Sequence, residues 1–165
     1  MRTLLKIIGL LIFAAVLIFL LAAPLRVRFF PVPDSLPTDK YAASYLTEPV
    51  LRDISASLGW QSTGVLLRPG EKIKFRYVSG EIRDAESIIR GPAGAGFVCG
   101  DSTCCEPMPE VPRDALIGRV GDQLFLIGDQ SAIEVREGGE LQLRINDCDA
   151  GLFDNSGGLQ VKISP

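Results

Sequence analysis

The sequence predicts an all-β domain, an antiparallel β-sandwich, that follows an N-terminal apolar helix. From Trp60 onward, short runs of alternating apolar and polar residues are separated by turns rich in Gly and Pro. No run in that region has the period of an amphipathic helix. About seven short strands without a helix are typical of a two-sheet sandwich. The beginning of the chain is different, because Leu4 to Ala23 is almost wholly apolar.

Residues 4–23 are long enough to cross a membrane, since a spanning helix needs roughly 20 apolar residues. Only Lys6 and Gly9 interrupt them. A cleaved secretory signal is the alternative, but its apolar region is usually about 7 to 15 residues long, and Pro24 after Ala23 hinders cleavage there. We therefore expect residues 1–23 to form a transmembrane or signal-anchor helix. The domain would then lie on the periplasmic, extracytoplasmic side, or be secreted if residues 1–23 are removed.

Residues 24–56 are predicted to be a Pro-rich linker and a lead-in segment before the domain at 57–165. Four prolines between Pro24 and Pro37 exclude a regular helix there. Tyr41–Tyr45 and Val50–Leu58 fit either short helical turns or a lead-in strand.

The turn signals and the period of two residues predict the strands of the domain. Gly121-Asp122 is a hairpin turn, and Ser79-Gly80 marks a bulge or a turn. The segment from Gly91 to Pro112 is rich in Gly, Pro and Cys, and we expect it to be a loop cross-linked through its cysteines. The expected strands are Gln61–Leu67, Lys72–Val78, a weaker one within Glu81–Ile89, Ala115–Val120, Gln123–Ile127, Ala132–Val135, Glu140–Ile145 and Leu159–Ile163.

The composition excludes several classes of function. The chain has no histidine, which excludes Ser-His-Asp and Cys-His catalysis and histidine-based zinc sites. Beyond residue 28 it holds 13 basic and 20 acidic residues, a net charge of −7, which argues against a nucleic-acid partner. The carboxylates of Asp149 and Asp154 could suggest glycoside hydrolysis, but a sandwich this small lacks a deep cleft. We expect no enzyme activity.

The four cysteines, Cys99, Cys104, Cys105 and Cys148, all lie in the distal domain. An even number suits an oxidising compartment and predicts at least one disulfide. Reduced, buried cysteines are the alternative.

The loop from Asn146 to Gly157 carries the most chemistry. It holds three carboxylates and two carboxamides between Asn146 and Asn155. Calcium takes 6 to 8 oxygen ligands from carboxylates, amides and backbone carbonyls, and such a loop could supply them. The alternative is an ordinary polar hairpin loop in which Asp and Asn form turns. The spacing is not that of an EF-hand.

Other candidates have simpler explanations. Trp60 could stack on a sugar but is expected in the core. Glu106, Glu110 and Asp114 are expected on a solvated face.

Several segments resemble the LecA-like family of galactose-binding bacterial lectins, over roughly Ser57 to Ile163. The most specific is Asn146-Asp147 followed at the family spacing by Asp154-Asn155-Ser156-Gly157. The others are Trp60–Val65, Pro69-Gly70, Val78–Gly80, Gly96–Cys99 with Cys104, Ala115–Gly121 and Gly139–Leu143.

The resemblance implies a jelly-roll-like β-sandwich that binds one Ca²⁺, which in turn binds two hydroxyls of a carbohydrate, such as a galactoside. Asp147, Asp154 and Asn155 would be side-chain ligands of calcium, with backbone carbonyls from Gly151 and from near Asp84. The sugar would contact Asp147, Asp154 and the backbone at Cys148. The resemblance also allows a homo-oligomer.

The chain departs from the family at three places. Pro92–Gly96 has no polar side chain where the family holds sugar with His and Gln, and Asp154 replaces an Asn. Cys99 and Cys104 match the family's pair, whereas Cys105 and Cys148 are extra. A bridge from Cys104 or Cys105 to Cys148 would clamp the site, and three pairings remain open. Calcium is thus expected, whereas the part of the site that is specific for galactose is missing or replaced. The alternative function is a calcium- or disulfide-stabilised sandwich that binds protein or envelope partners without sugar.

Overall fold

The computed structural model describes residues 40–84, 88–100 and 103–165. The chain divides into two units, Met1–Pro31 and Val32–Pro165, and every described residue belongs to the second. The predicted membrane span, residues 4–23, lies outside the described residues. Within those residues, no helix combines the length and the apolar character that crossing a bilayer requires.

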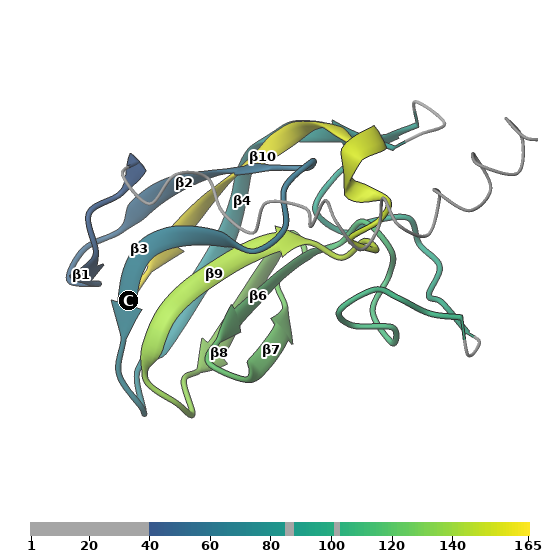
Figure 1. Cartoon of the computed structure of the whole chain (residues 1–165). Helices are drawn as coiled ribbons and strands as arrows, with labels where there is room; N and C mark the ends of the chain where they lie inside the picture. Colours follow the sequence, from purple (N-terminus) through teal and green to yellow (C-terminus); the bar gives the residue numbers. More distant parts are fainter. Residues whose placement is uncertain (1–39, 85–87, 101–102) are drawn as a thin grey trace, which may run out of the picture. The chain divides into compact units, whose positions relative to one another are not determined.

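Two sheets form a β-sandwich (Figure 1). The first sheet has the order β1 (Ser44–Tyr45), β3 (Gln61–Leu67), β9 (Gly139–Ile145), β6 (Leu116–Val120) and β7 (Gln123–Leu126). The second has the order β2 (Val50–Ser55), β10 (Ser156–Ser164), β4 (Lys72–Arg83) and β5 (Ile89–Arg90), and β8 (Gln130–Glu134) also pairs with β4. All pairs are antiparallel except β1 with β3. The predicted sandwich is confirmed.

The lead-in segment contributes to the second sheet. Of the two structures considered for Val50–Leu58, the strand is the correct one, and it ends at Ser55. Strand β2 pairs with β10 from Val50 to Ser55. The sandwich therefore includes strands that precede residue 57.

The strands follow the predicted period of two, which places alternate side chains in the core. Ile73 and Phe75 of β4 are each 2% exposed, and the apolar residues of β9 and β10 are equally buried. Between the two sheets, the core contains Leu141, Leu143, Ile145, Leu159, Val161 and Ile163. The predicted inward faces of these strands are confirmed.

Strand β4 is longer than predicted, and two different strands pair with its two ends. Its first half pairs with β8 and its last residues pair with β5. The register against β10 shifts between Gln160 and Val161, where Val78 of β4 is left without a partner between Tyr77 and Ser79. Gly80 follows this bulge, pairs with Leu159 and has a φ of 104° that suits glycine. Beyond this bulge, β4 continues to Arg83, and Asp84 follows directly.

A second apolar cluster covers the outer face of the first sheet. It consists of Trp60, Met108, Val111, Ala115 and Ile117. Trp60 is 7% exposed, which confirms the prediction that it is a core residue. The cluster fixes the long loop from residue 91 to 115 against β6, and this loop forms one side of the candidate site.

Candidate ligand-binding pocket

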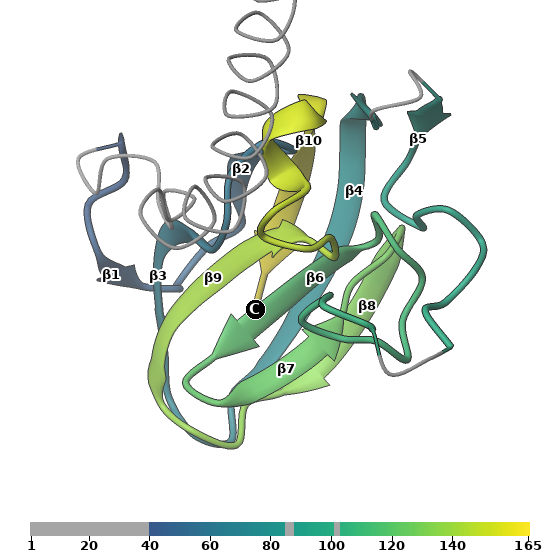
Figure 2. The same ribbon diagram turned by 45° about the vertical axis from the view of Figure 1, so that its right-hand side comes forward.

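One end of the sandwich contains a cavity of about 360 Å³. Three segments meet there: the β4–β5 end, the 91–115 loop and the connection from β9 to β10 that includes the short 3-10 helix η2 (Leu152–Asp154) (Figure 2). The lining residues are Asp84, Arg90, Phe97, Arg113, Asp114, Asp147, Cys148, Gly151, Asp154 and Asn155. Every residue predicted for metal or sugar binding lines this one cavity.

Asp147 is held in place as soon as β9 ends. Its side chain is largely buried, with the residue 7% exposed. Oδ1 accepts a hydrogen bond from the backbone N–H of Cys148 at 2.8 Å, and Oδ2 accepts one from Asn155 Nδ2 at 2.9 Å. An Asp that bonds the following backbone stabilises a turn. The carboxylate therefore has a fixed position in the lining of the cavity.

Buried Arg144 orients the chain on either side of Asp147. Its side chain is 2% exposed, and it donates to the carbonyls of Ile145 at 3.0 Å and of Asp147 at 2.7 Å. It also donates to Asp149 at 2.8 Å. Trp60 lies 5.5 Å from the guanidinium. The alternation of apolar and polar residues along β9 would place Arg144 on a solvent-exposed face, but the cluster around Trp60 lies against this face and buries it.

The helical turn η2 positions the other acidic group of the loop. Leu152 is fully buried and anchors η2, while Phe153 is 80% exposed. Asp154 lines the cavity and has no side-chain hydrogen bond or ion pair with any described residue. Gly151 lies so close to Asp147 that a Cβ there would be 3.1 Å from Oδ2. Among the described residues, the Asp154 carboxylate thus has no side-chain partner, and the Asp147 carboxylate lies against Gly151.

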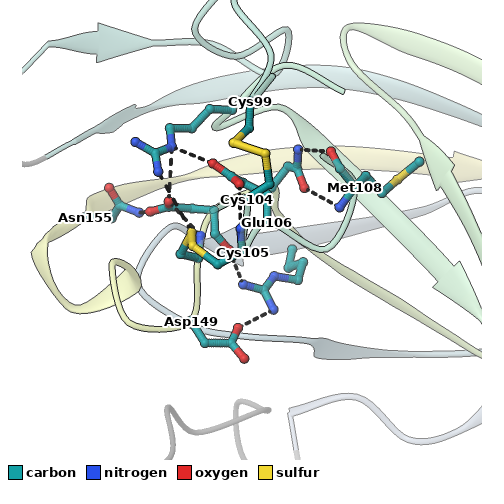
Figure 3. Close-up of a disulfide and its surroundings, with 12 residues drawn as sticks. Cys99, Cys104, Cys105, Glu106, Met108, Asp149 and Asn155 are labelled. Atoms are coloured by element: carbon teal, nitrogen blue, oxygen red, sulfur yellow. Dashed lines mark hydrogen bonds and ion pairs between the residues drawn. A yellow bond between two sulfur atoms is a disulfide. The ribbon is translucent and has the colours of Figure 1, made fainter. Parts of the chain in front are cut away.

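Asn146 is a structural residue and is not oriented for ligand binding. It is fully buried. Its Nδ2 donates to the carbonyls of Met108, Val111 and Pro112, and its Oδ1 accepts from the N–H of Met108 at 3.0 Å. Asn146 therefore fastens the 91–115 loop to the end of β9 (Figure 3 labels Met108).

Two disulfides join the loops around the cavity. Cys99 pairs with Cys104, and Cys105 pairs with Cys148. They lie close together beside Glu106 (Figure 3). Among the pairings that the sequence left open, the structure selects the one in which Cys105 connects the 91–115 loop to the residue after Asp147. The prediction of at least one disulfide is confirmed.

Arg90 neutralises two carboxylates on the β5 side. It donates to Asp84 Oδ2 at 3.1 and 2.8 Å and lies 3.1 Å from Asp114 Oδ2. Asp114 is 2% exposed and has a φ of 64°, a conformation that Asp tolerates better than most residues. Burial, together with the Asp147 charge, raises the pKa of Asp114 to about 6, although Arg90 acts in the opposite direction.

Arg113 connects two further carboxylates. Its Nε lies 3.0 Å from Glu106 Oε1 and 3.7 Å from Asp147 Oδ1. Glu106 is 6% exposed, so the prediction that Glu106 and Asp114 belong to a solvated face is wrong for both, while Glu110 is exposed as predicted. Each buried carboxylate is compensated by an arginine. Nothing in the sequence linked these acids to Arg90 and Arg113, because the paired residues are not placed at a spacing that a strand or helix would bring together.

The oxygen donors around the cavity fit calcium in kind. Carboxylates of Asp147 and Asp154, the amide oxygen of Asn155 and backbone carbonyls of Gly151 and of the chain near Asp84 belong to the ligand types that Ca²⁺ takes. The carboxylates are spread around the cavity: among the described residues, groups of three acidic or sulfur ligands within 4.8 Å of one another occur only where Glu106 meets a disulfide. Disulfide sulfurs do not act as thiolate ligands.

No protein-family model and no curated protein matches the chain. Among solved structures, the N-terminal domain of EclA, a PllA-like lectin, superimposes with a TM-score of 0.55 and 22% identity, over 71% of this chain and 97% of that domain. PliG of Aeromonas hydrophila, a periplasmic inhibitor of g-type lysozyme, reaches a TM-score of 0.32 at 6% identity, over 75% and 97%, which supports no argument. The first comparison shows that the chain has the fold of a lectin domain.

Proposed function

We propose that this domain is a calcium-dependent carbohydrate-binding module, lectin-like and non-enzymatic, on the extracytoplasmic side of a membrane. The observation that carries the proposal is the cavity of about 360 Å³, which brings Asp147, Asp154 and Asn155 together with Asp84 and Gly151. The fold is that of a domain described as a PllA-like lectin. The relation to LecA-like lectins, the calcium and the tether remain parts of the proposal.

Each residue has a distinct role in the proposed site. Calcium would be held by Asp147, Asp154 and Asn155 with carbonyls of Gly151 and the Asp84 region, and it would supply a Lewis-acidic contact for two sugar hydroxyls. Asp147 and Asp154 would also accept hydrogen bonds from those hydroxyls, and charged acceptors form the stronger bonds. The Cys148 N–H already donates to Asp147, so this backbone lies beside the same carboxylate.

Binding without catalysis is the simpler proposal for this cavity. Asp149, one of the two carboxylates considered for hydrolysis, is 71% exposed on its side chain and pairs with Arg144. It is not part of the cavity lining. A pair of carboxylates facing one bond, as glycoside hydrolysis needs, is thus not formed by Asp149 and Asp154.

The two disulfides favour a compartment outside the cytoplasm, because cytosolic thiols are kept reduced. All four cysteines of the chain are paired. A membrane tether through residues 4–23 would place the domain at an envelope surface, and determination of the mass of the mature protein would show whether residues 1–23 are retained.

A second function has an observation in its favour. Arg90 and Arg113 form ion pairs with four carboxylates, those of Asp84, Asp114, Glu106 and Asp147, so each of these acids has a cationic partner without a metal. Ion pairing of this kind allows a disulfide-stabilised domain to keep its fold without calcium and to bind a protein or envelope partner and no sugar.

Calorimetric titration with Ca²⁺, followed by a glycan array with and without a chelator, separates the two functions. The proposed function expects a calcium-dependent glycan signal that Asp147→Ala abolishes. Asp149→Ala is the matched control in the same loop and should leave both calcium and glycan binding intact. Calcium binding without any glycan signal would favour the second function. An unchanged calcium affinity in Asp147→Ala would show that the proposed calcium site is wrong.

A further inference from the structure

We propose that the outer face of the second sheet docks onto an anionic phospholipid bilayer. Four basic residues form this basic face: Lys72, Lys74 and Arg76 of β4 and Lys162 of β10. Their side chains would contact the phosphate groups of the lipid headgroups. The inference goes beyond ligand binding in the cavity, and it rests on the proposed function only for the membrane tether.

The alternation of side chains along the strands points the basic face away from the core. The apolar residues of β4 and β10 that alternate with the basic ones, such as Phe75 and Val161, lie in the core. Because successive side chains of a strand point to opposite sides of the sheet, the basic residues point outward, and all four are exposed. Lys162 pairs with Arg76, so positive charges from two neighbouring strands lie side by side.

The basic face carries positive charge that the described residues do not compensate. Elsewhere, exposed Lys40 and Arg68 form ion pairs with an aspartate and a glutamate, whereas no residue of the basic face forms an ion pair with a described residue. Lys74 donates only to the carbonyl oxygen of Pro165, at 3.5 Å. Because the chain beyond residue 28 has a net charge of −7, this concentration of unpaired cations is a local feature that complements an anionic surface.

A hollow of about 510 Å³ lies within the basic face. Lys74, Arg76 and Lys162 line it, and the other residues of its lining are uncharged. Glu134, which pairs with Lys72 at one end of the face, is not part of this lining. Lysine binds phosphate as a point charge and arginine through its planar guanidinium, so a hollow with three cations and no acid is complementary in charge to lipid phosphates.

The described part of the chain begins beside the same sheet. Lys40 Nζ lies 3.3 Å from Asp53 Oδ2 on β2, and Asp53 Oδ1 accepts a hydrogen bond from Gln160 Nε2 on β10. Gln160 precedes Lys162 by two residues and therefore shares its side of the sheet. A tether through residues 4–23 would thus lead into the domain at the sheet that carries the basic face. This connection favours the bilayer itself over a soluble polyanion as the partner.

Docking through the basic face leaves the ligand-binding cavity accessible. The basic residues of β4 belong to its first half, whereas Asp84 of the cavity follows its other end. An extended strand from Arg76 to Asp84 spans roughly 25 Å. The domain can therefore lie on the bilayer and present the cavity beside it.

The test uses the full chain reconstituted in vesicles, with Trp60 as the donor for energy transfer to dansyl-labelled lipid. Trp60 is the chain's only tryptophan and lies in the cluster outside the first sheet, away from the basic face. Energy transfer should be higher in vesicles of phosphatidylcholine with phosphatidylglycerol than in phosphatidylcholine alone. Salt at about 1 M should remove the difference, since the Debye length then falls to about 3 Å.

Lys74→Gln and Lys162→Gln should each lower the ratio of docked to undocked domains about fivefold, the contribution of one basic residue at an anionic surface. Lys74→Arg and Lys162→Arg keep the charge and should retain docking. Lys40→Gln is the matched control, because this exposed lysine is already paired with Asp53, and its loss should lower the ratio less than the loss of either lysine of the face. Equal effects of all three Gln variants would overturn the assignment to this face.

Equal energy transfer in neutral and anionic vesicles would overturn the inference and leave the proposed calcium and glycan binding intact. If the chain instead bound soluble polygalacturonate, and Lys74→Gln weakened that binding, the face would be a site for an acidic polysaccharide. A chain that alkaline carbonate extracts from the vesicles would refute the tether. Co-sedimentation of that chain with anionic but not neutral vesicles would then support docking, and its absence would overturn both.

Discussion

Asn155 donates a hydrogen bond from Nδ2 to Oδ2 of Asp147 at 2.9 Å. Both residues are 7% exposed, and the bond closes the loop between β9 and β10 (Figure 3 labels Asn155). An amide nitrogen thus faces the carboxylate, whereas calcium binds oxygen only. If both residues ligate calcium, the Asn155 amide must bind the ion through its oxygen, and this role is open to experiment.

Asn155→Asp should make the stability of the domain depend more strongly on calcium. Without metal, the substitution removes the N–H donor and places a second negative charge against Asp147, which should lower the free energy of unfolding by about 1 to 3 kcal/mol. With calcium, both carboxylates can ligate and the loss should be recovered. Thermal unfolding in chelator and in excess calcium measures the difference.

Gln160→Glu is the control for this effect. Gln160 Nε2 also donates to an aspartate, Asp53, at 3.1 Å, but in an exposed position outside the cavity. This variant should show the same calcium-induced shift in melting temperature as the wild type. If Asn155→Asp also behaves like the wild type, Asn155 is not a calcium ligand.

The two disulfides should contribute unequally to stability. Cys105–Cys148 closes a loop with a sequence separation of 43, and Cys99–Cys104 one of 5. Because the entropy lost by the unfolded chain grows with loop length, replacing Cys105 and Cys148 by Ser should cost about 4 kcal/mol, against about 2 kcal/mol for Cys99 and Cys104. Denaturant unfolding of the two double variants measures both values.

Removal of the Cys105–Cys148 bridge should also weaken calcium binding, since it anchors the residue that donates to Asp147. The Cys99–Cys104 variant should bind calcium as the wild type does. Equal losses in the two variants would show that the bridge next to Asp147 has no special role.

Gly151→Ala should impair the metal site with little effect on the fold. The new Cβ would lie 3.1 Å from Oδ2 and 3.4 Å from Oδ1 of Asp147, so the carboxylate would have to move. Gly151 has a φ of −96°, a conformation open to alanine, so the backbone is not strained. Calcium affinity by calorimetry should fall, whereas Gly91→Ala, where a Cβ meets nothing within 4 Å, should leave it unchanged.

The period of two predicted which residues form the core, and a glycine-marked turn predicted the β6–β7 hairpin. Val120 and Gln123 pair across Gly121-Asp122, with Gly121 at a φ of 56°. These features are local, so a single stretch of sequence contains the information. The division of β4 between β8 and β5 is not local, since β8 and β10, which also pair with β4, lie far from it along the chain.

The acidic loop was predictable from composition, but its partners were not. Asp147 and Asp154 stand out because oxygen ligands are concentrated in one loop. Arg90 and Arg113 are ordinary in their own segments and acquire their roles only when three segments meet at one end of the sandwich. Arg144 shows the same limit, because alternation assigns it to a polar face that the Trp60 cluster then covers.

Arg144→Met should destabilise the protein much more than Asp149→Ala. The first change leaves the carbonyls of Ile145 and Asp147 without their donor in a buried position, which should cost about 2 to 4 kcal/mol. The second removes an acid whose side chain is 71% exposed, so the loss should be below about 1 kcal/mol. Chemical denaturation compares them, and similar losses would mean that the carbonyl bonds contribute little.

Asp114 should give the metal-free domain a characteristic pH dependence. Its pKa is raised from 3.8 to about 6, chiefly by burial. Between these values the folded protein keeps a proton that the unfolded chain releases, so this carboxyl favours folding at low pH. Its contribution to the free energy of unfolding is lost as the pH rises from about 4 to about 6, and the full change is about 3 kcal/mol.

Asp114→Asn isolates this contribution, because an amide cannot titrate and Asn tolerates the φ of 64° found there. In chelator, the free energy of unfolding of the variant relative to the wild type should therefore increase as the pH rises from 4 to 7, by up to about 3 kcal/mol. Other carboxyls, such as Asp53, whose pKa is lowered mainly by its hydrogen bond from Gln160, titrate in both proteins and cancel in the comparison. Urea unfolding at several pH values measures it, and a difference that stays constant from pH 4 to 7 would show that Asp114 keeps an ordinary pKa despite its burial.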